Sequence, residues 1–311
     1  MVVYVILGIC IILILALCIF SWKLSSLVIH PIVKGYEDTY QREIKGEKFD
    51  EKSYKAWRKT DFNIKSTYGY DLSCELIEDE AYENLEEKTK IMVMVHGITY
   101  SKFGSIKYTE MFIKRGFKVL IYDHRNHGLS GKGPTTMGFY EKYDLKTVID
   151  WCYKTYGKDI LLGTHGESMG AATVLAHLEV DKRPAFIIAD CGYSDLRELL
   201  AYQLRVRYNL PPFPFIPVSN IFVKLRAGFN INKVSPIKEV AKTNTPILFV
   251  HGEKDDYVPT YMSEKMYAAK KDKKELYIAP NAAHAEAHWK NKKEYEERVN
   301  RFLDKYVFNN S

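Results

Sequence analysis

Cysteine is scarce in this chain, and its few residues form no recognisable pair. Five cysteines are scattered over 311 residues, an odd number without a C-x-x-C spacing. Such a set predicts neither a disulfide framework nor a structural zinc site. Glycine and proline, with 18 and 11 residues, are also too few for a collagen-like or low-complexity chain. We therefore expect an ordinary packed core with free thiols.

The chain also lacks a concentration of charge of one sign. Its 45 Lys and Arg residues are interleaved with 39 Asp and Glu residues, which leaves a formal net charge of +6. A nucleic-acid-binding protein would gather its cations on one face, so we expect no nucleic-acid partner. A hydrophobic share of 46% excludes a disordered chain and is enough for a sizeable core.

One long apolar run stands at the N-terminus. Residues 2–20 carry no charged side chain, and as a helix they would span about 28 Å, close to the thickness of a bilayer core. Trp22 and Lys23 follow, an aromatic and a cationic residue suited to the headgroup region. Neither a basic start nor a small-x-small cleavage site is present, which favours an uncleaved membrane anchor over a signal peptide.

The cations Lys23, Lys34 and Arg42 all lie after this run. The positive-inside rule therefore favours a cytoplasmic position for the rest of the chain, although the short tail before the run gives little to compare. By composition, the chain divides into an anchor at 1–22 and a juxtamembrane connector with short helical pieces at 23–60. The core follows in two parts, 61–194 and 244–311, with an insertion at 195–243 between them.

The core reads as strands alternating with helices. After a hairpin around Tyr68-Gly69-Tyr70, apolar runs indicating buried strands lie at 90–95, 118–123, 159–164, 185–190, 246–251 and 275–279. Between them are amphipathic, helix-like stretches near 104–115, 141–155, 169–180, 261–271 and 291–306. This alternation predicts an α/β fold with a mostly parallel sheet covered by helices on both faces.

The insertion at 195–243 interrupts this alternation. It holds two amphipathic segments, near 195–208 and 218–228, joined by a connector at 210–217 that contains four of the eleven prolines. An insertion of this length between two strands predicts a helical lid over a site, with extra core helices as the alternative. Phe213 and Phe215 in the connector are candidates for contact with an acyl group; the alternative is that they only fix the lid to the core.

The strongest chemical motif is Gly166-Glu167-Ser168-Met169-Gly170, between a predicted strand and a predicted helix. A nucleophile on such a tight turn needs minimal neighbours, hence Gly166 and Gly170. The helix behind it favours developing negative charge. The motif makes Ser168 the candidate nucleophile.

A serine needs a base, and the base needs an acid to orient it. On this type of fold the acid should follow a late strand and the histidine the last strand. Asp255 and His284 stand at these two positions. The rivals are Asp256 and Asp190 for the acid, and His288 for the base; spacing favours Asp255 and His284.

An oxyanion site needs two backbone N–H donors. Met169, directly after the nucleophile, supplies one. The other should come from the loop after the strand at 90–95, where Gly97 precedes Ile98, our first choice, and Thr99, our second.

With these motifs the chain resembles the α/β-hydrolase superfamily, in particular its serine aminopeptidase and monoacylglycerol-lipase-like branch, including membrane-anchored bacterial members. The resemblance covers about residues 60–308. Besides the triad it rests on His96-Gly97, the run at 123–130, Ser235-Pro236-Ile237 and the H-G-x-x-D-x-x-V-P pattern at 251–259. It implies the fold and the catalytic machinery more strongly than the substrate.

We expect a serine hydrolase that cleaves a carboxylic ester through an acyl-enzyme, without cofactor or metal, and a lipophilic acyl ester is the candidate substrate. One alternative is a serine aminopeptidase, with Glu167 or Glu198 holding the substrate's amine. The other is a non-catalytic scaffold tethered to the membrane. The sequence leaves the oligomeric state open.

Overall fold

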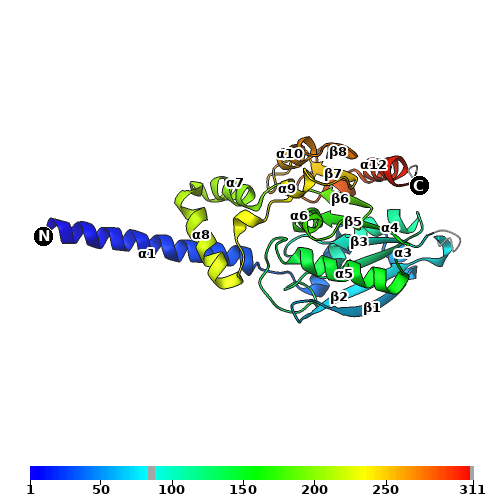
Figure 1. Cartoon of the computed structure of the whole chain (residues 1–311), viewed down its shortest axis with the longest axis horizontal. Helices are drawn as coiled ribbons and strands as arrows, with labels where there is room; N and C mark the ends of the chain where they lie inside the picture. Colours follow the sequence, from blue (N-terminus) through cyan, green and yellow to red (C-terminus); the bar gives the residue numbers. More distant parts are fainter. Residues whose placement is uncertain (83–87, 309–311) are drawn as a thin grey trace.

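A computed structural model gives the architecture of residues 1–82 and 88–308. A single eight-stranded sheet, ordered β1-β2-β4-β3-β5-β6-β7-β8, forms the centre of the body (Figure 1). Strand β2 runs antiparallel to both of its neighbours, and the other strands pair in parallel. The strands are β1 (Arg58–Lys65), β2 (Asp71–Glu78), β3 (Lys90–Val95), β4 (Phe117–Tyr122), β5 (Leu161–Glu167), β6 (Phe186–Asp190), β7 (Ile247–Gly252) and β8 (Lys274–Ala279).

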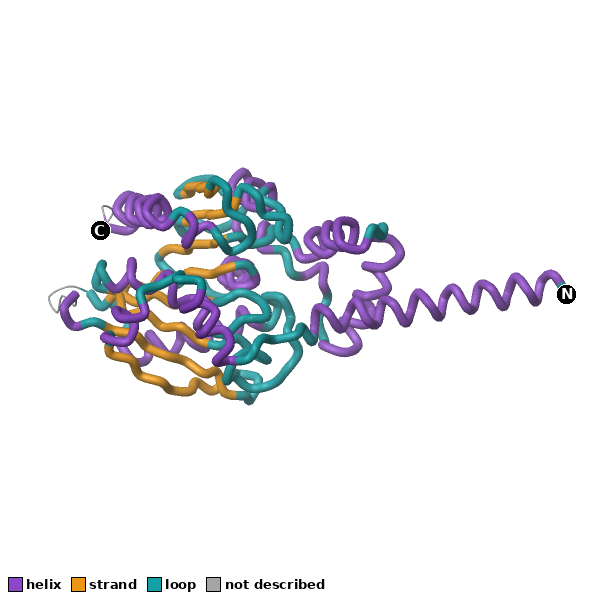
Figure 2. The backbone as a smooth tube through the Cα atoms, turned by 180° about the vertical axis from the view of Figure 1, so that it is seen from behind, coloured by secondary structure: helices purple, strands orange, loops and turns teal. Residues whose placement is uncertain are grey.

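Helices cover both faces of this sheet, as the alternating pattern predicts (Figure 2). The helices are α1 (Val2–Ile29), α2 (Tyr36–Lys45), α3 (Glu51–Ala56), α4 (Ile106–Ile113), α5 (Glu141–Tyr156), α6 (Met169–Ala176), α7 (Leu196–Tyr208), α8 (Pro212–Ala227), α9 (Pro236–Val240), α10 (Tyr261–Ala269), α11 (Ala287–Lys290) and α12 (Lys292–Leu303). Alternate residues of a strand face opposite sides of the sheet, so the core has two parts, one on each side. Met92 and Met94 of β3 pack on the side of α4 and α12, whereas Ile91 and Val93 pack on the side of α5 and α6.

The N-terminal helix α1 is long and apolar enough to cross a membrane. It extends beyond the boundary expected at residue 22 and ends at Ile29, immediately before His30 and Pro31. Proline disfavours helical geometry in the residue before it, which explains this end. The N-terminal part of α1 projects away from the body, while its last turns lie beside α8 (Figures 1 and 2).

The segment 195–243 is helical, but its proline-rich stretch differs from the prediction. We expected a stiff connector over 210–217, and the structure begins helix α8 there. Phe213 is non-helical, so the regular turns start at Pro214. Proline is favoured in the first turn of a helix, where backbone N–H groups have no partner within the helix. Pro217 also interrupts no helical hydrogen bond, because its partner four residues earlier would be Phe213, which is non-helical. The prolines thus start the helix instead of preventing it.

The connector at 23–60 contains the last turns of α1 together with α2 and α3, and β1 begins at Arg58. It packs on the body, since Tyr54 of α3 is buried in the same core cluster as Met92 and Phe112. The predicted boundary at 61 falls inside β1, and residues 83–87 and 309–311 of the predicted parts 61–194 and 244–311 lie outside the described residues.

Candidate active site

Ser168 stands on a sharp turn between β5 and α6. Its backbone has φ 57° and ψ −116°, and its N–H donates to the carbonyl of Asp190 at 2.8 Å. A Cβ on Gly166 would lie 2.3 Å from the carbonyl oxygen of Gly170, and a Cβ on Gly170 would lie 2.0 Å from that of Val95. No larger residue fits at either position, which explains the two glycines of the motif.

The structure brings Ser168, Asp255 and His284 together, although they are far apart in the sequence. Nε2 of His284 lies 2.9 Å from Oγ of Ser168, and Nδ1 lies 2.7 Å from Oδ2 of Asp255. The three residues follow β5, β7 and β8, whose carboxyl ends meet at one edge of the sheet. The arrangement can pass a proton from the hydroxyl to the imidazole while the carboxylate orients the ring.

The environment of Asp255 keeps this carboxylate ionised. Its Oδ1 accepts the N–H groups of Tyr257 and Val258, each at 2.9 Å, and Nε2 of His251 lies 3.1 Å from its Oδ2. Burial alone would raise the pKa of Asp255, but the hydrogen bonds with His251 and His284 hold it well below its ordinary value. The contribution of His251, which lies in β7 four positions before Asp255, was not foreseen from the sequence.

The rivals for the acid and the base lie elsewhere. Asp256 is exposed. Asp190 accepts a hydrogen bond from Tyr108, and burial together with the nearby negative charge of Glu167 raises its pKa to about 7. His288 is buried against the rings of Tyr108 and Tyr295.

The two amides selected for an oxyanion site occupy suitable elements. Met169 is the first residue of α6, so its N–H has no partner within the helix. Ile98 lines the same cavity as Ser168. The N–H of Thr99 already donates to Nε2 of His127 at 3.2 Å, so it is less available than that of Ile98.

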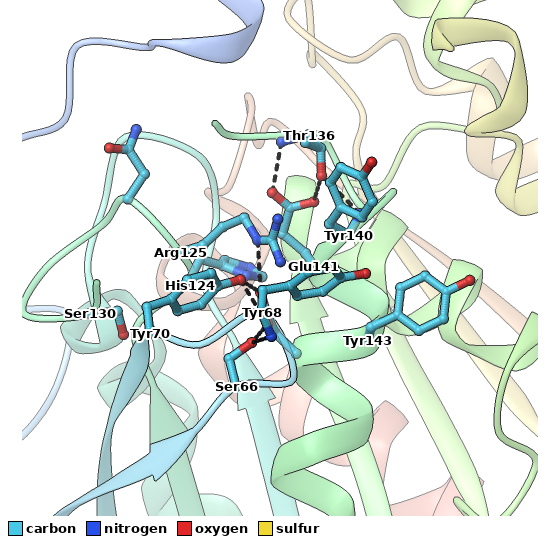
Figure 3. Close-up of polar contacts among 12 residues, drawn as sticks. Ser66, Tyr68, Tyr70, His124, Arg125, Ser130, Thr136, Tyr140, Glu141 and Tyr143 are labelled. Carbon is cyan, nitrogen blue, oxygen red and sulfur yellow. Dashed lines mark hydrogen bonds and ion pairs between the residues drawn. The ribbon is translucent and has the colours of Figure 1, made fainter. Parts of the chain in front are cut away.

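The loop after β4 makes contacts that hold neighbouring segments in place. Its Arg125 donates from Nε to Asp144 at 2.8 Å and lies over the rings of Tyr68 and Tyr70 (Figure 3). In the same loop His127 accepts from Thr99, as described above, and His124 donates its N–H to Nε2 of His96. These hydrogen bonds hold the loops after β3 and β4 against each other.

A cavity of about 480 Å³ surrounds the hydroxyl of Ser168, and we call it the Ser168 cavity. The connector supplies part of its wall, a contribution that the sequence did not reveal. Among the described residues, each carboxylate lining this cavity has a lysine partner: Glu43–Lys48 at 2.9 Å, Glu167–Lys107 at 2.5 Å and Glu286–Lys290 at 2.6 Å.

Glu167 illustrates how such pairing changes a side chain's chemistry. Burial alone would raise its pKa, but the ammonium of Lys107 and the hydroxyl of Tyr108 hold it below the ordinary value. Glu198, the other candidate for binding an amine, is paired with Lys265 at 2.8 Å and does not line the cavity. Both carboxylates therefore already have a lysine partner.

The structure does not bring Phe213 and Phe215 to Ser168. Phe213 is exposed, and the ring of Phe215 packs edge-on against Phe20 of α1, with centroids 5.3 Å apart. Neither side chain lines the Ser168 cavity. Phe215 thus packs on the anchor helix instead of contacting the site.

One group of described residues has spacing that could suit a metal, namely Cys191, Asp255 and His284. Asp255 and His284 are already hydrogen bonded to each other, and burial raises the pKa of the Cys191 thiol far above its usual range. A thiolate is the form that binds metal. The donor set therefore suits a proton relay better than a metal site.

The chain is similar in sequence to a known protein family and to a bacterial relative. The model of the prolyl oligopeptidase family matches residues 105–310. YqkD of Bacillus subtilis is 38% identical over 283 residues, which cover 90% of each chain.

Two solved structures share the architecture. An esterase from Pyrococcus furiosus superposes with a TM-score of 0.65 at 24% identity, covering 83% of this chain and 95% of its own. The acylaminoacyl peptidase of Pyrococcus horikoshii gives 0.59 at 19% identity, covering 82% of this chain and 43% of its own. These similarities show the α/β-hydrolase fold predicted from the sequence.

Proposed function

Since this chain belongs to the prolyl oligopeptidase family and is a serine hydrolase, we propose that it cleaves carboxylic esters through an acyl-enzyme on Ser168. The observation that carries the proposal is the continuous hydrogen-bonded path from Asp255 through His284 to Ser168. A hydroxyl becomes a useful nucleophile only when a base can take its proton, and this path supplies the base.

In the first half of the reaction the oxygen of Ser168 attacks the carbonyl carbon while His284 takes the proton. The amides of Ile98 and Met169 stabilise the negative oxygen of the tetrahedral intermediate. The intermediate collapses, the ester C–O bond breaks, and His284 returns the proton to the departing alcohol. Water then repeats the sequence to release the acid, and Asp255 stabilises the imidazolium in both halves.

Peptide hydrolysis is the second candidate, and it has its own support in the matching family and the similar acylaminoacyl peptidase. An aminopeptidase would need a free carboxylate for the substrate's amine. The carboxylates around the Ser168 cavity are instead paired with lysines. This pairing favours esters over peptides with a free N-terminus.

We also propose that α1 anchors the enzyme in a membrane, because it is long and apolar enough to span one. The catalytic body would then stand directly at the surface of the bilayer, since α8 packs on the last turns of α1.

The test is a substrate panel of p-nitrophenyl esters and aminoacyl amides, together with labelling by a fluorophosphonate. We expect ester hydrolysis and labelling by the wild type, and a loss of at least about 10⁴-fold in kcat in Ser168→Ala. Ser53→Ala, on α3 and outside the cavity, is the matched control. Unchanged turnover in Ser168→Ala would refute the mechanism, and turnover of amides alone would favour the peptidase.

A further inference from the structure

A second cavity adjoins the Ser168 cavity under the lid. It has a volume of about 340 Å³, within the usual range for small-molecule sites. Ile98, Thr99 and Tyr257 line both cavities, so the two adjoin at these residues. The ring of Tyr257 lies 4.9 Å from that of His284, which places the junction next to the reacting groups. We call this second space the lid cavity.

The walls of the lid cavity are mostly apolar and come from three helices. Its described lining residues include no carboxylate and a single cation, Arg207. The wall includes one side chain that is polar and unpartnered, the buried hydroxyl of Ser219. The main apolar contributors are Leu24 and Val28 of α1, Leu199 and Leu200 of α7, and Ile216 and Val223 of α8. A cationic group would lose its hydration here without a carboxylate to compensate for it, whereas a hydrocarbon chain is favoured by an apolar wall.

Helix α1 links this wall to the region where a bilayer would lie. The same helix that lines the cavity with Leu24 and Val28 continues as the long apolar segment projecting from the body (Figure 1). Beside it, α8 exposes large apolar side chains to the outside: Ile221 is 55% exposed and Leu225 is 76% exposed. The lid is therefore apolar both on the surface next to the anchor and in its interior.

Helix α1 is firmly attached to the lid. Nη1 of Arg226 on α8 donates to the carbonyl of Trp22 at 3.1 Å and to the hydroxyls of Ser25 and Ser26 at 2.6 and 2.8 Å. Its guanidinium also lies 4.0 Å from the centre of the Trp22 ring. These contacts make the end of α1 a fixed part of the cavity wall.

From these observations we infer that the membrane anchor forms part of the substrate site. The acyl chain of an ester enters from the bilayer along α1 and lies in the lid cavity, while its carbonyl reaches Ser168 past Tyr257. The substrates are thus membrane-resident esters of medium or long acyl chains. This inference rests on the proposed ester hydrolysis and adds to it the class of substrate and its route.

The experiment compares p-nitrophenyl acetate and decanoate on the full-length enzyme in lipid nanodiscs. Ser219→Phe fills the cavity from α8, and Leu24→Trp fills it from α1. Each methylene of the substrate's acyl chain that can no longer enter the lid cavity lowers kcat/KM by about fourfold. We expect both variants to lower the decanoate-to-acetate ratio of kcat/KM by at least about tenfold.

Two matched controls introduce the same bulk on the same helices outside the cavity. Ile221→Phe on α8 and Ile19→Trp on α1 replace exposed side chains that do not line it, so the ratio should stay at the wild-type value. Acetate turnover reports folding, and Ser219→Leu provides a smaller filling residue if Ser219→Phe does not fold.

An unchanged ratio in the cavity variants, or an equal fall in the controls, would overturn the inference while leaving ester hydrolysis intact. A wild type that hydrolyses neither ester would instead contradict the proposed function itself.

Discussion

At the scale of single residues, Asp255 is the most constrained group of the site. Two backbone amides hold one of its oxygens, and the imidazoles of His251 and His284 lie at the other. These contacts keep the carboxylate ionised and fix which nitrogen of His284 faces Ser168. The adjacent Asp256 is exposed. Identical side chains in neighbouring positions thus have different environments.

This contrast gives a direct prediction. Asp255→Asn should lower kcat by about 10³- to 10⁴-fold, because an amide at this position stabilises the wrong tautomer of His284. Asp256→Asn is the matched control and should keep wild-type turnover of the same ester. Equal activity of the two variants would show that Asp255 is not the orienting acid.

At the scale of elements, the turn from β5 to α6 determines where Ser168 stands. Gly170 faces the carbonyl oxygen of Val95 at the end of β3, so the turn can form only if the helix approaches the neighbouring strand closely. The glycines of the motif are therefore needed for the close packing of α6 on β3 as well as for the turn at Ser168.

A methyl group tests this requirement. Gly170→Ala should lower the free energy of unfolding by about 1–3 kcal/mol and reduce ester turnover, because the turn must shift to admit the Cβ. Gly133→Ala is the control, since a Cβ there meets nothing within 4 Å. Chemical denaturation and kcat measured on the same preparations decide the matter. A Gly170→Ala enzyme as stable and active as Gly133→Ala would contradict the packing argument.

At the scale of the whole molecule, the apolar helix lies at one end and the catalytic body follows it. The cations Lys23, Lys34 and Arg42 all follow the apolar run. By the positive-inside rule, we expect the body in the cytoplasm.

Protease protection on cells that produce the full chain measures this orientation. We expect the body to resist external protease in intact cells and to be degraded after the membrane is permeabilised. Degradation in intact cells, with a cytoplasmic marker protein still protected, would place the body outside instead.

The sequence predicted the features that depend on local pattern. The strands were visible as apolar runs, and Ser168, Asp255 and His284 could be selected because each follows such a run in the expected order. Features that depend on tertiary packing were not visible. From its prolines, the start of α8 was predicted to be a connector. Only the structure shows that Phe213 is non-helical, so that Pro217 breaks no helical hydrogen bond.

The same limit applies to the surroundings of the site. Glu43 and Lys48 reach the Ser168 cavity from the connector, more than a hundred residues before the nucleophile, and no periodicity links them to it. The pairing of Glu167 with Lys107 likewise joins two elements of unrelated pattern. These pairs support the proposed preference for esters, because the carboxylates that an aminopeptidase would use to bind the substrate's amine already have lysine partners.

The attachment of Arg226 to Trp22, Ser25 and Ser26 has a mechanical consequence. A helix in a bilayer adjusts its tilt to the local thickness of the hydrocarbon layer. Since α1 is joined rigidly to α8 and not through a flexible stalk, a change of tilt would rotate the lid together with the helix. The thickness of the surrounding lipid would then act on the lid cavity, which α1 and α8 both line.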